Sequence, residues 1–141
     1  TTMGHRRKAR ELAMQALYFR DMQTEEMAKD DFVKLFCAHY NESLPEDVEP
    51  FFFELISGVL ETKEILDKKI ETSSSNWKIS RMSGIDRNVM RVAVFEMLYC
   101  PDIPGKVSIN EAIDIGKKFG TKESGPFING ILDNIYLGKD E

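Results

Sequence analysis

A basic cluster near the start of the chain is the strongest candidate for binding chemistry. Its members are Arg6, Arg7, Lys8 and Arg10. On a helix, Arg6 and Arg10 stand one turn apart with Arg7 beside them, so their guanidinium groups lie close together. Guanidinium groups bind phosphate through two hydrogen bonds and stack on unpaired bases, so the cluster predicts contact with RNA. A solvated helix end would also explain these residues, and their spacing alone leaves both interpretations open.

The charge of this opening differs from that of the rest of the chain. Residues 1–20 hold five basic side chains against a single acidic one, whereas residues 21–75 hold five against fourteen. Residues 76–141 are balanced, and the net charge of the 141-residue chain is −5. Exposed charges are screened beyond about 8–10 Å, so a basic end on an acidic protein still attracts phosphate locally. We therefore expect RNA to approach the N-terminal helix and to avoid the acidic middle of the chain.

The residue patterns of known catalytic and metal sites are missing from the sequence. It contains no glycine-rich phosphate loop, no H-E-x-x-H motif and no nucleophile elbow. Cys37 and Cys100 lie far apart and fit no zinc spacing, and His5 and His39 are equally isolated. The sequence therefore predicts a protein that is not an enzyme and that needs no metal or cofactor.

Cysteine usage and hydropathy indicate the compartment. Two distant cysteines point to a reducing environment rather than to a disulfide framework. The apolar stretches are much shorter than the roughly 20 residues that a membrane helix needs, and no signal sequence opens the chain. These features predict a cytoplasmic protein without membrane attachment.

Helical periodicity runs through most of the chain, and no convincing strand alternation interrupts it. Apolar stripes predict helical segments at about 9–20, 25–40, 45–70, 77–79, 86–100, 108–119 and 124–137. About seven helices with short connections predict an all-α fold, in which two small helical bundles pack as one compact domain over residues 1–141. A serine-rich stretch near residues 72–76 is the expected seam between the two bundles.

Several of the predicted helices carry local start signals. Thr24 is a candidate N-cap, and the tetrapeptides that begin at Ser43 and Ser108 both match the capping box. Asp86 fits the cap or the first turn of the fifth segment. Glu96 falls among apolar positions of that segment, where a buried carboxylate needs a partner.

Three blocks of sequence together resemble the NusB family of transcription antitermination proteins. The first is Arg6-Arg7-Lys8-Ala9-Arg10-Glu11 followed by Gln15-Ala16-Leu17-Tyr18. The second is Asp86-Arg87 followed by Met90-Arg91-Val92-Ala93-Val94-Phe95-Glu96-Met97. The third joins Pro104-Gly105-Lys106-Val107-Ser108-Ile109-Asn110-Glu111-Ala112, Lys117-Lys118-Phe119-Gly120 and Phe127-Ile128-Asn129-Gly130-Ile131-Leu132. Residues 21–75 match the family weakly.

The resemblance implies a non-catalytic factor that binds boxA RNA beside NusE, a ribosomal protein with a second role in transcription. Such a complex would tether nascent RNA to RNA polymerase in an antitermination complex. The RNA-contacting positions that it implies are Arg6, Arg7, Lys8, Arg10, Lys122 and Phe127. The positions that it implies on the NusE side are Tyr18, Asp86 and Glu123. Many relatives have a basic residue just before the Phe127 position, where this chain has Pro126.

Other interpretations stay open at this stage. NusB-like domains also resemble the front end of some RNA methyltransferases, although this sequence has no glycine-rich cofactor loop. A purely protein-binding helical module would instead direct its arginines at an acidic partner. The sequence also does not choose between a monomer and a homodimer that buries the arginine face.

Overall fold

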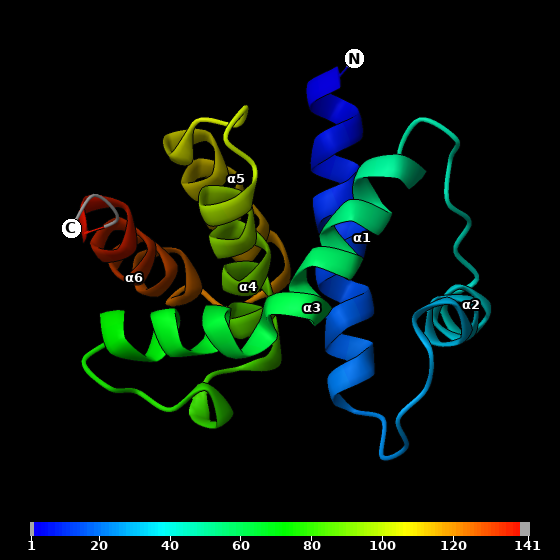
Figure 1. Ribbon diagram of the computed structural model, residues 1–141, viewed down its shortest axis with the longest axis horizontal. Helices are drawn as coiled ribbons and strands as arrows, with labels where there is room; N and C mark the ends of the chain where they lie inside the picture. The colour runs from blue at the N-terminus through cyan, green and yellow to red at the C-terminus, as the bar shows by residue number, and fades with distance from the viewer. Residues whose placement is uncertain (1, 139–141) are drawn as a thin grey trace.

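The computed structural model describes residues 2–138, with side chains from residue 4 onward. In this range the chain forms six α-helices and one turn of 3-10 helix, and no β-strand (Figure 1). The elements are α1 (Thr2–Asp21), α2 (Lys29–Tyr40), α3 (Glu49–Ser73), η1 (Ile79–Arg81), α4 (Gly84–Tyr99), α5 (Gly105–Phe119) and α6 (Ser124–Gly138). The predicted all-α fold is therefore confirmed.

Helix α4 is the centre of the structure because it is apolar on nearly all sides. Every residue from Asn88 to Met97 is buried, which is typical of a helix surrounded by other helices. Helices α1, α3, α5 and α6 all pack against α4, whereas α2 lies at the edge of the molecule beside α1 (Figure 1). A single cluster of buried apolar side chains draws on all six α-helices. No helix in residues 2–138 has both the length and the apolar content needed to cross a membrane.

Three of the four predicted start signals do not mark the start of a helix. Helix α2 begins at Lys29 rather than after Thr24, and its N-cap residue is Ala28. Helix α3 begins at Glu49 rather than near Ser43, with a proline (Pro50) in its first turn.

The other two start signals concern helices α5 and α4. Helix α5 begins at Gly105, so Ser108 lies inside it, where its hydroxyl donates a hydrogen bond to Glu96 (2.9 Å). Asp86 does occupy the first turn of α4, where its backbone N–H donates to the Ser83 hydroxyl (3.0 Å).

The serine-rich stretch lies where α3 ends and the chain turns toward η1. Ser75 and Asn76 adopt left-handed backbone angles, with φ of 58° and 65°. The turn therefore falls within the predicted seam at 72–76. The division into two bundles stays a prediction.

Candidate nucleic-acid interface

Arg10 joins α1 to α4 and α5 from a buried position. Its Nε and Nη2 atoms each lie 2.8 Å from a different carboxylate oxygen of Glu96, and its Nη1 atom lies 2.9 Å from Glu111. The side chain of Arg10 is only 5% exposed. Glu96 thus has the partner that a buried carboxylate requires, and it also accepts the hydrogen bond from Ser108. Since its guanidinium edges face carboxylates, Arg10 is not placed at the surface where RNA would bind.

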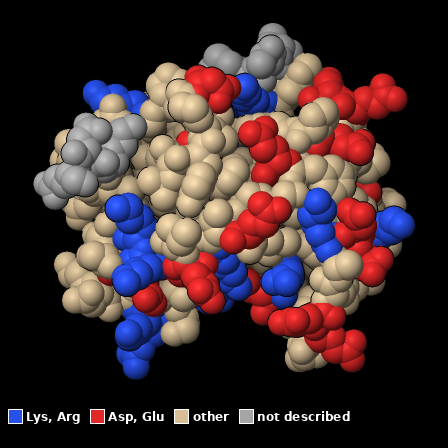
Figure 2. Space-filling view, in the orientation of Figure 1, with Lys and Arg blue, Asp and Glu red and all other residues tan. Residues whose placement is uncertain are grey.

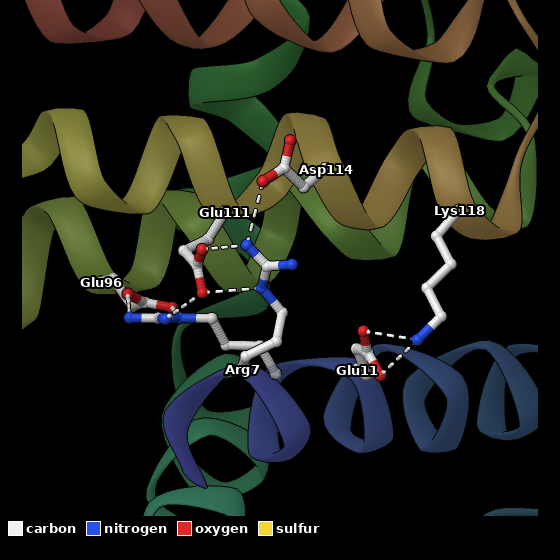
Figure 3. A network of polar contacts seen from close by, with 7 residues as sticks. Arg7, Glu11, Glu96, Glu111, Asp114 and Lys118 are labelled. Atoms are coloured by element: carbon white, nitrogen blue, oxygen red, sulfur yellow. Dashed lines mark hydrogen bonds and ion pairs between the residues drawn. The ribbon is translucent and has the colours of Figure 1, made fainter. Parts of the chain in front are cut away.

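Arg7 stands one turn earlier on α1 and is held by two acidic residues of α5 (Figure 3). Its Nε and Nη2 atoms contact the Glu111 carboxylate, and Nη2 also lies 3.0 Å from Asp114. The hydrogen bond from Arg7 is the main cause that lowers the pKa of Glu111, and the same contact raises the pKa of Arg7. Among the contacts within the described residues, none occupies Nη1 of Arg7, which points away from the two carboxylates (Figure 3).

Arg6 and Lys8 stand on either side of Arg7 in the sequence, and both remain accessible. Arg6 makes only a long contact to Asp102 (3.5 Å), and its guanidinium lies 5.2 Å from the centre of the Phe51 ring. Lys8 is exposed and makes no ion pair with any residue whose side chain the structure describes. The first turns of α1 therefore present Arg6, Arg7 and Lys8 together, while Arg10 anchors the helix beneath them.

The surface continues from α1 along α5 toward α6. Lys118 pairs with Glu11 at 3.0 Å, which places the second half of α5 beside α1 (Figure 3). Lys117 lies against Gly125, since a Cβ atom at Gly125 would approach its Cε atom to 2.9 Å. Lys122 is exposed in the loop between α5 and α6, and the half-buried ring of Phe127 follows in the first turns of α6. The structure thus connects the basic end of α1 to the predicted positions Lys122 and Phe127 across α5.

Two of the three predicted partner positions, Tyr18 and Asp86, lie toward the far end of α1, and Glu123 lies in the loop before α6. The ring of Tyr18 packs against Gly84, where a Cβ atom would lie 2.4 Å from the ring. This contact places Tyr18 beside the first turn of α4, which contains Asp86. One carboxylate oxygen of Asp86 (Oδ1) is buried and has no hydrogen-bond partner among the described residues. Glu123 is exposed, and its backbone carbonyl accepts the N–H of Phe127 at 3.1 Å.

Sequence reasoning missed three residues of this surface and one beside it. Glu111 was assigned to a capping box, and Asp114 and Lys118 carried no local signal because their partners come from α1. Trp77 was placed in a short turn without a role, although it is 53% exposed and its ring contacts that of Phe127. The one usable signal was Glu96: its position predicted that the carboxylate needs a partner, and the structure identifies that partner as Arg10.

The described residues contain no arrangement suited to catalysis by a thiol or a metal. No group of histidine, cysteine, aspartate and glutamate side chains in residues 4–138 is close enough to hold a metal ion. Burial is the main cause that raises the pKa of the Cys100 thiol to about 12, so this group stays protonated and unreactive near neutral pH. Within the described residues, the candidate site is therefore the accessible basic end of α1 on an all-helical fold.

Comparison with known families gives the more particular class. The NusB family model matches residues 7–137. The transcription antitermination protein NusB of Desulforapulum autotrophicum is 51% identical over 138 residues, which cover 98% of this chain and 95% of the relative. The protein of the same name from Desulfatibacillum aliphaticivorans is 52% identical over 141 residues, with coverage of 99% and 96%. The chain belongs to the NusB family.

Solved structures of the family share this fold. The T. maritima NusB structure is 33% identical, with a TM-score of 0.80 over 94% of this chain and 91% of that one. A chain from the crystal structure of antitermination factors NusB and NusE in complex with dsRNA is 25% identical, with a TM-score of 0.82 and coverage of 96% and 98%. The predicted family is therefore confirmed, and with it the prediction that the chain is not an enzyme.

Proposed function

We propose that this protein is a transcription antitermination factor that binds boxA-type RNA together with NusE. The observation that carries the proposal is the exposed basic end of α1. There Arg6, Arg7 and Lys8 are accessible while the buried pair of Arg10 and Glu96 holds the helix in place. The relatives named NusB, and the NusB–NusE–dsRNA complex that this chain resembles, support the same function. A protein that acts on nascent transcripts in a bacterium would work in the cytoplasm.

Arg7 is the residue best prepared for phosphate. Carboxylates of Glu111 and Asp114 hold two of its nitrogen atoms, so the side chain is oriented before RNA arrives. The remaining nitrogen, Nη1, can donate to a phosphate oxygen, and Arg6 and Lys8 add charge on either side. Ordering a side chain in advance lowers the conformational cost of binding. Arg10 contributes to RNA binding as a positioning residue, through the placement of α1.

The predicted RNA-contacting residues and the predicted partner residues would occupy different parts of this surface. Lys122 and Phe127 would extend the RNA path beyond α5, with the aromatic ring available to an unpaired base. Tyr18 and Asp86 would face NusE, because they lie toward the opposite end of α1 from the arginines, and Glu123 would join them from the loop before α6. The bound RNA and NusE would then meet near the start of α6, and the complex would connect the transcript to RNA polymerase.

The alternative of an RNA methyltransferase domain receives less support. The chain covers 95% and 96% of the length of the two relatives named as antitermination proteins. A match over nearly their whole length favours a factor that acts through binding alone.

The test is RNA binding by the wild-type protein and by an Arg6→Ala/Arg7→Ala variant, with and without NusE. We expect NusE to strengthen binding of labelled boxA-type RNA and the variant to lose it. A Lys29→Ala/Lys34→Ala variant removes the same charge from α2 and serves as the matched control. If both variants lose affinity equally, the effect is one of net charge and the assigned interface is wrong. If the wild-type protein binds no RNA at low salt even with NusE, the proposed function fails.

A further inference from the structure

Trp77 is an exposed aromatic residue that has no role in the proposed RNA interface. It is the only tryptophan in the chain, and 53% of its surface is exposed. It lies between α3 and η1, where its ring meets Phe127 edge to face. The ring centres are 6.0 Å apart and the ring planes make an angle of 70°. The two side chains therefore form one aromatic cluster that is open to solvent.

The backbone around Trp77 is fixed by hydrogen bonds on both sides. Its own N–H donates to the carbonyl of Ser74 (3.3 Å), and the N–H of Asn76 donates to the carbonyl of Glu71 (2.9 Å). The Glu71 carboxylate then accepts the N–H of Ile79 at 2.7 Å. These bonds fix the backbone that carries the exposed indole, and the ring itself rests on Phe127, so less ordering is needed when a flat ligand binds.

The surroundings of this cluster are positively charged, although the chain as a whole is acidic. Lys68, Lys69, Lys78 and Arg81 are all exposed in this region. Figure 2 shows basic side chains gathered over the C-terminal half of α3 and the turn that follows it. Two of the neighbouring acidic groups, Asp67 and Glu71, are engaged within the fold, whereas Glu64, Asp133 and Glu123 are exposed. Asp67 binds Arg91 with contacts of 2.8 and 3.0 Å, and Glu71 binds the backbone of Ile79.

A groove accompanies the cluster. It is lined by Ser75, Asn76, Trp77, Lys78 and Arg81, with a volume of about 370 Å³. All five residues are exposed, so the groove is shallow and open to solvent. The groove thus joins an aromatic face, two cations and the polar side chains of the turn.

The cluster is also continuous with the basic end of α1. From Glu111, which holds Arg7, to Lys118 is about 10 Å along α5 at a rise of 1.5 Å per residue. Lys117 then covers Gly125, two residues before Phe127, and Phe127 contacts Trp77. One extended strand could therefore follow the surface from Arg7 to Trp77.

We infer that Trp77 and Phe127 form a stacking platform for an unpaired base of the bound RNA, with Lys78 and Arg81 beside its phosphates. Proteins recognise single-stranded nucleic acid through aromatic rings that lie next to cations. The basic side chains of this region therefore favour RNA as the ligand over a protein partner with an acidic or apolar surface. This inference rests on the proposed function, because it extends the same RNA path.

The single tryptophan allows a direct test. Intrinsic fluorescence of the wild-type protein would be followed while single-stranded boxA-type RNA is added, and RNA affinity would be measured separately with labelled RNA. Stacking on a base quenches indole emission, so we expect quenching to saturate at the RNA concentration that saturates binding. We expect Trp77→Ala to raise the Kd roughly 5- to 20-fold and Trp77→Phe to raise it less, since a ring remains.

Controls separate this inference from the proposed function and from a folding defect. Tyr99 is an aromatic residue of 44% exposure at the C-terminal end of α4, whereas Trp77 precedes the N-terminal end of that helix. The control variant Tyr99→Ala should leave RNA affinity unchanged. Replacing RNA bases one at a time by abasic sites should reveal a position at which Trp77→Ala has no further effect. The wild-type emission needs no variant and so does not depend on how any variant folds.

Two outcomes would overturn the platform while leaving the proposed function intact. In the first, wild-type protein binds RNA and Arg6→Ala/Arg7→Ala weakens binding, but indole emission and the affinity of Trp77→Ala do not change. In the second, Trp77→Ala weakens NusE binding without RNA and leaves RNA binding unaltered, which would make Trp77 a protein contact. If the wild-type protein does not bind RNA under any condition, both the platform and the proposed function fail.

Discussion

Arg10 and Glu96 form a buried ion pair with two contacts of 2.8 Å, and this pair joins α1 to α4. The Arg10 and Glu96 side chains are 5% and 1% exposed. Glu111 and Ser108 complete the hydrogen bonds of the two charged groups. A buried pair of this kind adds little net stability, yet the loss of one partner leaves the other charge uncompensated. Its consequence here is positional, because it fixes α1 with Arg6, Arg7 and Lys8 outward.

Removing Glu96 alone should therefore destabilise the protein strongly. In Glu96→Leu, Arg10 stays buried and keeps one ion pair, with Glu111, and its contact with the Phe51 ring. We expect the free energy of unfolding, measured by urea titration, to fall by about 3–5 kcal/mol. The double variant Arg10→Met/Glu96→Leu removes both charges and should recover most of that loss. If Glu96→Leu lowers the free energy of unfolding by less than about 1 kcal/mol, the ion pair is in contact with water, contrary to the structure.

The ion pair between Arg7 and Glu111 should make stability depend on pH in the acid range. The hydrogen bond from Arg7 lowers the pKa of Glu111 below its ordinary value of 4.5 in the folded state. A lowered folded pKa gives stability that is fully present above 4.5 and is lost as pH falls through the folded pKa. We expect the unfolding free energy of the wild type minus that of Glu111→Gln to be constant near neutral pH and to shrink below 4.5. Chemical denaturation at a series of pH values measures this difference, and a difference that grows as pH falls would contradict the assignment.

The fold was predictable because its cause is visible in the sequence. Apolar residues recur every three or four positions and so predicted the helices, whereas the central place of α4 is visible only in the structure, where Asn88, Arg91 and Glu96 are buried as well. Helix starts were less predictable, because Ser108 and Glu111 match a capping box as well as they match their actual roles. Which role applies depends on Arg7, Arg10 and Glu96, which lie on other helices.

The site was predictable in part for the same reason. The one-turn spacing of Arg6 and Arg10 suggested a shared face but could not show that α4 and α5 bring carboxylates to Arg10. Glu96 was the available signal, since a carboxylate in an apolar stripe demands a cationic partner. Trp77 gave no such signal, because a period of three or four residues says nothing about an aromatic residue in a turn.

The contact between Tyr18 and Gly84 should control the surface assigned to NusE. A Cβ atom at residue 84 would lie 2.4 Å from the Tyr18 ring, so Gly84→Ala must displace that ring. We expect weaker NusE binding in a pull-down or calorimetric titration, while RNA binding without NusE stays unchanged. Gly130→Ala is the matched control, because a Cβ atom at Gly130, also helical, meets no atom within 4 Å in the described structure. Equal NusE affinity for both variants would remove Tyr18 from the partner surface.

The salt dependence of RNA affinity should report how few phosphate contacts the surface makes. With Arg10 buried, the predicted cationic contacts are Arg6, Arg7, Lys8 and Lys122, and the inferred platform adds Lys78 and Arg81. For single-stranded RNA each neutralised phosphate contributes about −0.7 to the slope of log K against log salt concentration, so we expect a slope of roughly −4 with the platform and roughly −3 without it. Arg6→Ala/Arg7→Ala should make the slope shallower by about 1.4, whereas Arg10→Ala should lower affinity through the displacement of α1. Fluorescence anisotropy over a series of salt concentrations measures both quantities. If Arg10→Ala makes the slope shallower by about 0.7, the contribution of one phosphate contact, then Arg10 leaves Glu96 to contact the RNA.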